Sequence, residues 1–299
     1  MFHVKHFPME ILKNCPVCGQ TSFVLYAKCQ DKLVSHDFFE VQKCNSCAFL
    51  FTNPRPSKDE IGPYYQSEEY FSHSTESKSL ISKVYNKVRD INIRSKVNLV
   101  KNELKDVESI LDYGCGVGLF LKQCKLDGLK VQGVEPSNEA REIASEYSIS
   151  VIDPDELSTF LGQSFDAISL WHVLEHIHDL DEKFNELVNL LSPSGKMFIA
   201  LPNPDSWDAN HYGSDWAAFD VPRHLYHFTK PTFKKFIAKY GMKIVGIQPM
   251  KFDAFYVSLL SEENSIMKYP NAFLKGFISN LKAGSSMNYS SLIYILERQ

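Results

Sequence analysis

Short apolar runs alternate with amphipathic stretches from about residue 107 to residue 299. Each run has the length of one buried strand, and most are followed by a stretch with apolar side chains at helical spacing. The runs are SILDYG, KVQGVEP, SISVID, FDAISLW, KMFIALPN, MKIVGIQP and SSLIYILERQ. Such an alternation of buried strands and helices predicts a parallel sheet with helices on both faces. We therefore predict an α/β fold, with a doubly wound Rossmann-like sheet over residues 107–299.

The N-terminal third of the chain follows a different pattern. SFVLYAK and HDFFEVQKC are β-rich runs within residues 11–52, which predicts a small β unit there. The next segment, NPRPSKDEIGP, is rich in proline and charge and is typical of a linker. A long amphipathic helix is predicted from about Ser77 to Leu104, so residues 53–106 are assigned to the linker and this helix.

Four cysteines in the N-terminal unit have the spacing of a metal site. CPVCG contains Cys15 and Cys18, and CNSC contains Cys44 and Cys47, with 25 residues between the pairs. Two residues between thiolates let one turn direct both sulfurs at an ion, and two such turns complete a tetrahedron. A redox role for a C-x-x-C pair is the alternative, but two pairs separated by strand-like runs favour structural zinc. Residues 11–52 are therefore predicted to be a zinc ribbon.

The segment LDYGCGVG joins the first apolar run to the following helix. It places Asp112 before three glycines, Gly114, Gly116 and Gly118, and Glu135 ends the next run. Glycines in this position let the backbone approach a ligand at the carboxyl edge of the sheet, and a carboxylate on the second strand can accept hydrogen bonds from ribose. A dinucleotide site would place the third glycine one residue later. An acid before the loop would repel a pyrophosphate, whereas it suits a ligand that carries an ammonium and a sulfonium group.

These residues resemble the D-x-G-x-G-x-G signature of class I S-adenosylmethionine-dependent methyltransferases, and FDAISLWHVLEH and LSPSGKMFIALPN extend the resemblance. It implies a seven-stranded sheet whose last strand runs antiparallel between the fifth and the sixth. It also implies that Glu135 binds the ribose of S-adenosylmethionine and that the adenine lies near the end of the third strand, where we expect Asp155. Trp171, at the end of the fourth strand, is a further expected cofactor contact.

The stretch WHVLEH follows this fourth strand and leaves three interpretations open. His172 can act as a general base or substrate ligand, because imidazole titrates near neutral pH. Some quinone-biosynthesis O-methyltransferases of this fold bind magnesium through a similar E-x-x-E-H element, but His172 replaces its first glutamate here. A metal site would then involve His172, Glu175 and His176. Alternatively, Glu175 and His176 are polar partners that fix the loop and flank the pocket.

A long insertion, NPDSWDANHYGSDWAAFDVPRHLYHFT, follows the fifth strand. Its aromatic and imidazole side chains can wall a substrate pocket, or the loop can fold on its own aromatic residues. PRHLYHFT resembles a segment of one broad methyltransferase subgroup in which His224 faces the cofactor cleft, so His172 and His224 are the catalytic candidates. Tyr64, Tyr65 and Tyr70 either close over the cofactor or pack the linker.

Composition limits the range of partners. The 299 residues are 44% hydrophobic and carry a formal net charge of -4, which argues against nucleic acid and anionic membranes as general partners, although a local basic patch is compatible with that charge. No apolar run approaches the ~18 residues that span a bilayer. The N-terminus lacks the features of an export signal, so the expected compartment is the cytoplasm.

The sequence thus predicts an S-adenosylmethionine-dependent methyltransferase that acts on a small-molecule acceptor. A zinc ribbon followed by such a domain is similar to the layout of nucleotide-sugar C-methyltransferases, which implies a sugar or a glycan or lipid-linked precursor. Two alternatives remain open: an RNA methyltransferase whose ribbon binds RNA, and a non-catalytic protein that binds the cofactor. The sequence favours no particular acceptor atom among oxygen, nitrogen and carbon.

Overall fold

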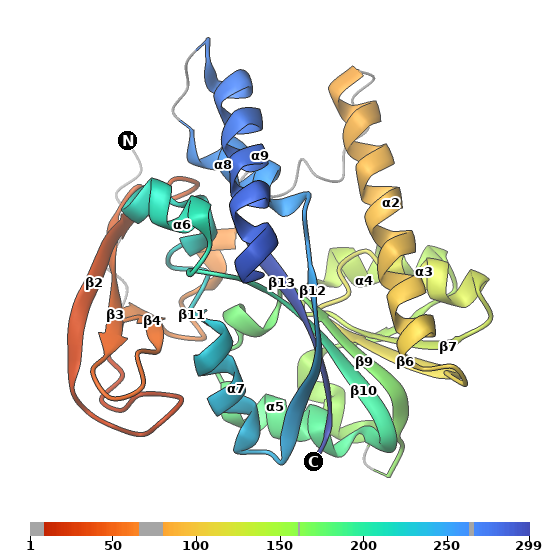
Figure 1. Ribbon diagram of the computed structural model, residues 1–299. Helices are drawn as coiled ribbons and strands as arrows, with labels where there is room; N and C mark the ends of the chain where they lie inside the picture. The colour runs from red at the N-terminus through yellow and green to blue at the C-terminus, as the bar shows by residue number, and fades with distance from the viewer. Residues whose placement is uncertain (1–8, 66–79, 161, 263–265) are drawn as a thin grey trace.

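A seven-stranded mixed sheet forms the centre of the computed structural model, which describes residues 9–65, 80–160, 162–262 and 266–299 (Figure 1). Its order is β12-β13-β10-β9-β6-β7-β8. The strands are β6 (Ser109–Tyr113), β7 (Lys130–Val134), β8 (Ser150–Ile152), β9 (Phe165–Trp171), β10 (Leu191–Pro202), β12 (Met242–Pro249) and β13 (Ser291–Arg298). Only β13 is antiparallel to its neighbours, β10 and β12. The predicted Rossmann-like fold with an antiparallel last strand is confirmed.

Helices cover both faces of this sheet. They are α2 (Leu80–Glu103), α3 (Leu119–Leu126), α4 (Asn138–Glu146), α5 (Leu180–Asn189) and α7 (Lys230–Ala238). Successive side chains of a strand point to opposite faces, so Ile110 of β6 packs in the buried cluster that contains apolar residues of α2 and α3. Leu111 packs in the cluster that contains those of α5 and α7. Apolar strands covered on both faces explain the continuous hydrophobic runs in the sequence.

The fifth strand begins earlier than the run KMFIALPN predicts, because the preceding stretch SPSG also belongs to β10. The pairing of β10 with β9 changes register between Leu191 and Lys196. An irregularity of this kind lets a strand accommodate a proline and a glycine without ending. Gly195 passes close to β9, since a Cβ atom there would lie 2.8 Å from the carbonyl oxygen of Asp166.

The N-terminal unit has a four-stranded antiparallel sheet in the order β11-β4-β3-β2. Three strands come from this unit, β2 (Phe23–Gln30), β3 (Phe38–Cys44) and β4 (Leu50–Thr52). The fourth, β11 (Tyr226–His227), comes from the insertion after β10, and Tyr226 pairs with Phe51. A two-residue pair, β1 (Met9–Glu10) with β5 (Arg55–Pro56), lies beside it. The N-terminal sheet is therefore completed by a strand from the C-terminal half of the chain.

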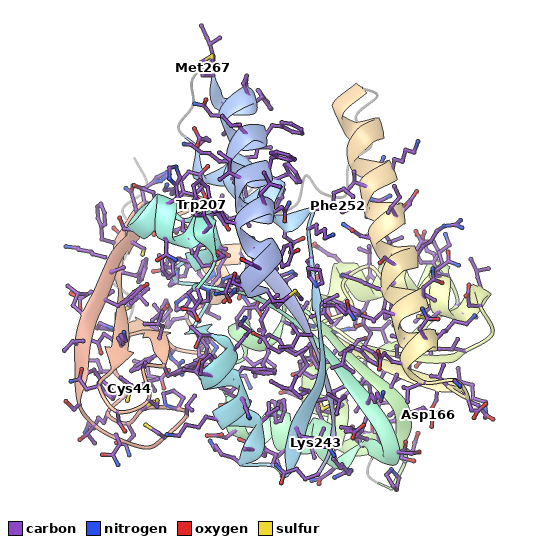
Figure 2. All side chains as sticks on the ribbon, in the orientation of Figure 1. Cys44, Asp166, Trp207, Lys243, Phe252 and Met267 are labelled. Atoms are coloured by element: carbon purple, nitrogen blue, oxygen red, sulfur yellow. The ribbon has the colours of Figure 1, made fainter. Side chains whose placement is uncertain are left out.

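Two helices between β12 and β13 project from the body of the molecule (Figure 1). They are α8 (Asp253–Ser261) and α9 (Lys268–Ser286), and α9 packs against α8 and against α6 (Trp207–Tyr212) of the insertion. Figure 2 labels Met267 at the tip of this hairpin and Phe252 at its base. Within the described ranges, no helix combines the length and apolar character that crossing a bilayer requires.

Candidate active site

The glycine loop lies between the end of β6 and α3. Asp112 is buried at the end of β6 and accepts a hydrogen bond of 2.6 Å from the Ser169 hydroxyl of β9. Burial raises the pKa of the Asp112 carboxyl to about 7. Gly114 has φ 75°, and a Cβ atom there would lie 2.5 Å from the side chain of Val173, so only glycine fits. The loop thus packs against Val173, and residues 114–117 remain partly accessible to a ligand.

Glu135 directly follows β7 and contacts this loop. One carboxylate oxygen accepts a hydrogen bond from the Gly116 amide at 2.9 Å, and the other accepts one from the Ser137 amide at 3.0 Å. Burial raises the pKa of Glu135. Because β6 and β7 are parallel neighbours, Asp112 and Glu135 lie at the same carboxyl edge of the sheet. The structure therefore brings together the two acids and the glycine loop, whose third glycine, Gly118, caps α3.

The other two expected cofactor contacts lie on either side of this edge. Trp171 ends β9, and its ring lies 5.3 Å from the ring of Phe120 in α3. Asp155 lies in the 3-10 helix η3 (Pro154–Phe160), is exposed and is 3.8 Å from the Lys58 ammonium. Asp153, which directly follows β8, instead accepts a hydrogen bond of 2.9 Å from Arg141.

Lys96 of α2 is a site residue that the sequence reasoning missed. Its ammonium lies 4.4 Å from the centre of the Trp171 ring and interacts with the carboxylates of Asp112 and Asp253. Burial lowers the pKa of this lysine. Its helical position was a usable signal, because Lys96 precedes the buried Val100 by four residues and so shares its face of α2.

His172 is held between two carboxylates. Its Nε2 lies 3.0 Å from Asp253 at the start of α8, and its Nδ1 lies 3.5 Å from Glu175. Burial alone would lower the pKa of His172, but these two acids outweigh it and raise the pKa to about 9. The residue also has φ 59°, in the left-handed region that non-glycine residues rarely adopt. At neutral pH His172 is therefore an imidazolium with both nitrogens engaged.

Glu175 lies at the centre of a second histidine group. Its side chain is fully buried, and apart from the 3.5 Å ion pair with His172 neither carboxylate oxygen has a hydrogen-bond partner among the described residues. His224 Nε2 is 3.9 Å from this carboxylate, and the rings of His176 and His224 are 4.6 Å apart. The ligand atoms of Glu175, His176 and His224 all lie within 4.8 Å of one another. This group can exchange a proton or coordinate a divalent ion. For a metal site the sequence suggested His172, Glu175 and His176, whereas the structure places His224, not His172, with the other two.

Backbone carbonyls fix both rings of this group. His224 Nδ1 donates to the Ala218 carbonyl at 2.9 Å, and His176 Nδ1 donates to the Arg223 carbonyl at 3.0 Å. In its neutral form, each ring therefore carries the lone pair on Nε2. Burial lowers the pKa of His176 to about 4, so this ring is neutral under ordinary conditions. The Tyr65 hydroxyl also lies 3.0 Å from His176 Nδ1, which brings the segment after the ribbon to the site, whereas Tyr70 lies outside the described residues.

The N-terminal unit supports this histidine group directly. Arg223, next to His224, is buried and forms an ion pair of 2.9 Å with the buried Asp31 of the N-terminal unit. The Thr52 hydroxyl of β4 donates to the His224 carbonyl at 2.7 Å. The position of His224 therefore depends on contacts between β11 and β4 as well as on its own insertion.

Most aromatic residues of the insertion pack away from the histidine group. Trp216 is buried, and its indole N–H donates to Asp208 at 2.8 Å. Trp207 stacks on His211 within α6, and the Tyr212 hydroxyl donates to Glu262. The insertion thus folds largely on its own aromatic residues and on α8 and α9, while Arg223 and His224 reach the candidate site.

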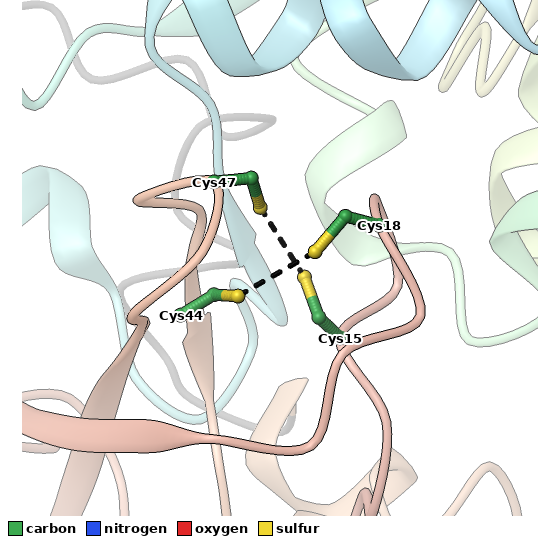
Figure 3. A group of neighbouring side chains, drawn as sticks. All are labelled: Cys15, Cys18, Cys44 and Cys47. Carbon is green, nitrogen blue, oxygen red and sulfur yellow. Dashed lines mark hydrogen bonds between the residues drawn. The ribbon is translucent and has the colours of Figure 1, made fainter.

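The four predicted zinc ligands lie together in the N-terminal unit (Figure 3). The sulfurs of Cys15 and Cys47 are 3.5 Å apart, as are those of Cys18 and Cys44, and all four lie within 4.8 Å of one another. A tetrahedral zinc ion with Zn–S bonds of ~2.3 Å places its sulfurs ~3.8 Å apart. Four thiolates at these separations fit a closed zinc site, which would have no open position for catalysis.

Both cysteine turns have the same backbone geometry. Gly19 and Ala48 each follow the second cysteine of a pair in the left-handed conformation, with φ 73° and 61°. Their amides donate to the carbonyls of Cys15 and Cys44 at 2.8 and 2.9 Å. The two turns therefore direct their sulfurs to a common point in the same way.

Comparisons with known proteins agree with this geometry. A family model described as a methyltransferase domain matches residues 85–247. The ubiquinone biosynthesis O-methyltransferase of Xanthomonas axonopodis pv. citri is 25% identical over 158 residues, which cover 48% of this chain and 66% of the relative. The enzyme of the same name from Pelagibacter ubique is 32% identical over 127 residues, which cover 40% and 50%. The chain thus matches about two thirds or less of the length of these relatives.

One solved structure with a similar fold is magnesium protoporphyrin IX methyltransferase from Synechocystis PCC 6803 with bound SAH. It has a TM-score of 0.51 and 15% sequence identity, and the match covers 79% of this chain and 97% of that chain. At this identity the likeness concerns the fold alone.

Proposed function

The chain belongs to the family of methyltransferase domains, whose model covers more than half of it, and from this premise we propose that it transfers a methyl group from S-adenosylmethionine to a small-molecule acceptor. The observation that carries the proposal is the shared edge of β6 and β7, where Glu135 holds the Gly116 amide beside the buried Asp112. The cofactor supplies a methyl group already activated by a sulfonium. The protein has to align the reacting groups and exclude water.

Each residue at this edge has a proposed part in holding the cofactor. Glu135 accepts hydrogen bonds from the ribose, and Asp112 attracts the ammonium group. The glycine loop admits the nucleoside, since a Cβ atom at Gly116 would have no neighbour within 4 Å among the described residues. Trp171 borders the cofactor, and Asp155 is assigned to the adenine end of the site.

We assign proton transfer to His224 and an electrostatic role to His172. The neutral form of His224 has its lone pair on Nε2, because Nδ1 donates to the Ala218 carbonyl, and the buried Glu175 at 3.9 Å stabilises the imidazolium that forms when His224 takes a proton. His172 carries a proton at neutral pH because Asp253 and Glu175 raise its pKa to about 9. A histidine that is already protonated cannot accept the acceptor's proton, but its positive charge can stabilise negative charge that develops on the acceptor.

We propose a sugar, or a glycan or lipid-linked precursor, as the acceptor and a structural zinc ion in the ribbon. The support for both is the sequence layout together with the contacts of the ribbon with the histidine group. Asp31 pairs with Arg223, and Thr52 binds the His224 carbonyl, so a substrate at His224 would lie next to the ribbon. Four cysteine sulfurs within 4.8 Å of one another fit the ion.

A transfer assay with methyl-labelled S-adenosylmethionine tests this function. Purified protein is incubated with fractionated small metabolites and, separately, with cellular RNA, and the label is followed in each fraction. We expect label in a small-molecule fraction that contains sugar nucleotides or glycan precursors. Label in RNA would show that the acceptor is RNA and not a small molecule. Cofactor binding without transfer to either pool would favour a non-catalytic role.

A further inference from the structure

Helix α9 carries an exposed apolar face that the proposed reaction does not use. Seven side chains from the start and the outer side of this helix are 48–97% exposed: Ile266, Met267, Tyr269, Phe273, Leu274, Phe277 and Leu281. The other side of α9 carries small residues that are buried against the rest of the protein: Ala272, Gly276, Ser279 and Ala283. Small residues therefore attach α9 to its own chain, and the large apolar residues remain in solvent. Figure 2 shows Met267 at the projecting tip.

We propose that a second copy of this chain covers the apolar face of α9, so that the protein is a dimer with two-fold symmetry. A symmetric dimer needs a surface that is complementary to itself, and an uncharged apolar stripe satisfies this condition without any repulsion between like charges. Within the described part of the chain, the face itself carries no ionisable group other than the phenol of Tyr269. The neighbouring α8 adds Phe252, Tyr256 and Leu260, which are 41–44% exposed.

The amount of exposed apolar surface fits this occupant. Five of these ten exposed side chains are aromatic, with roughly 150–250 Å² each, and five are large aliphatic ones, so together they leave on the order of 1,000 Å² uncovered. The largest apolar patch on an ordinary monomer is about 300–600 Å². A stable dimer buries about 800 Å² on each partner, which α9 and part of α8 can supply.

The charges on α9 argue against a membrane as the occupant. Helices that lie on anionic bilayers are rich in lysine and arginine on the polar face, where these cations are free to reach the headgroups. Lys268, Lys275 and Lys282 lie about 140–180° around the helix from Phe273. Lys275 pairs with Glu262 and lies 5.0 Å from the Tyr212 ring, so this lysine is directed toward the protein. Because Lys275 is bound within the protein and the chain carries a net charge of -4, α9 offers an anionic bilayer less attraction than three free lysines would.

A segment of the same chain is also a poor occupant. Two longer segments lie outside the described part of the chain: residues 1–8, with the large apolar residues Met1, Phe2, Val4 and Phe7, and residues 66–79, with Tyr70 and Phe71. Neither segment has enough large apolar side chains to cover the seven of this face. A second copy brings seven matching apolar residues at once.

The mass of the full-length protein in solution tests the proposal. We expect light scattering coupled to size exclusion, at about 50 μM, to give twice the chain mass of 34.2 kDa for the wild type. The variants F273E/F277E and L281E should give the single-chain mass, because a buried carboxylate opposes association. The matched control is L126E, which changes a 74% exposed leucine on α3 and should remain dimeric. Circular dichroism confirms that each variant is folded.

Three outcomes would overturn the proposal. The first is a monomeric wild type at this concentration, and the second is a dimer that both α9 variants leave intact. The third is a monomeric wild type that sediments with phosphatidylglycerol vesicles while F273E/F277E stays in solution, which would assign the face to a membrane.

Discussion

The Glu135 carboxylate joins the glycine loop that follows β6 to the start of the helix that follows β7. One oxygen holds the Gly116 amide, and the other holds the Ser137 amide at the start of α4. Each is a hydrogen bond to a charged acceptor, worth about 1.5–3 kcal/mol. The neutral amide in E135Q weakens both contacts and removes the charge proposed to bind the ribose.

We therefore expect E135Q to bind S-adenosylhomocysteine about 10- to 100-fold more weakly than the wild type in titration calorimetry. The control is E139Q, which makes the same change at an exposed position in the first turn of α4. Equal affinities of the two variants for S-adenosylhomocysteine would show that Glu135 does not bind the cofactor.

His172 makes stability depend on pH in a direction that can be worked out. Asp253 and Glu175 raise its pKa from 6.5 to about 9 in the folded protein. The folded state therefore binds the proton more tightly than the unfolded state. This stabilisation is complete below pH 6.5 and is lost as the pH rises through 9. At ~1.4 kcal/mol per pKa unit it amounts to roughly 3 kcal/mol.

We expect the difference in unfolding free energy between wild type and H172Q to shrink between pH 6.5 and 9.5 in urea melts. The variant H211Q removes an exposed histidine of α6 and should keep the wild-type pH profile. Parallel wild-type and H172Q profiles over this range would show that the two carboxylates do not hold the proton.

At the scale of elements, the sequence predicted what lies within one β-α-β unit and missed what joins distant segments. Asp112, the glycine loop and Glu135 were identifiable because strand β6, helix α3 and strand β7 follow one another along the chain. The contact of His172 with Asp253 spans 81 positions, and no local pattern announces it. Lys96 was missed for a different reason: a lysine on an amphipathic helix is ordinarily assigned to the side of the helix that faces solvent.

The pattern of hydrophobic and polar residues also could not predict strand β11. Two residues, Tyr226 and His227, cannot show an alternation, and their pairing with β4 depends on the fold of the whole chain. The same holds for the ion pair of Asp31 with Arg223, which are 192 positions apart. The sequence placed Arg223 in a candidate loop but gave no means to find its partner.

This buried ion pair should contribute far more to stability than an exposed pair across the same boundary. Asp31 and Arg223 are 0% and 1% exposed. Loss of Asp31 leaves Arg223 with Asp220 as a remaining carboxylate partner and removes the acceptor of the Ser35 amide, so we expect a cost of about 3 kcal/mol, the low end of the range for a broken buried pair. The pair of Lys32 with Asp215 is exposed and should contribute at most ~1 kcal/mol. Urea melts of D31A and D215A measure the two costs. Similar losses for both variants would contradict a structural role for the Asp31 pair.

At the scale of the whole molecule, the zinc ribbon and the cofactor edge are separable in principle. The ribbon contacts the histidine group through Thr52, Asp31 and strand β11, whereas Asp112 and Glu135 lie on strands of the central sheet. Loss of the ion should therefore disturb His224 and leave the cofactor edge in place. Structural zinc contributes to folding directly, so loss of the proposed ion should unfold the cysteine turns first. Cys15, Cys44 and Phe51 pack in the same buried cluster as Leu111 of the sheet, which is the route by which a larger disturbance would spread.

We expect elemental analysis to find one zinc ion per chain in the wild type and none in C18S/C47S. This variant should bind S-adenosylhomocysteine within about 3-fold of the wild type, an effect of less than ~0.7 kcal/mol, and lose methyl transfer because the ribbon no longer supports His224. The control is C29S, a buried cysteine of β2 outside the four-cysteine group, which should keep its zinc. If C18S/C47S lost cofactor binding as well, the ribbon and the sheet would form one cooperative unit. Retention of full transfer without zinc would instead mean that His224 does not depend on the ribbon.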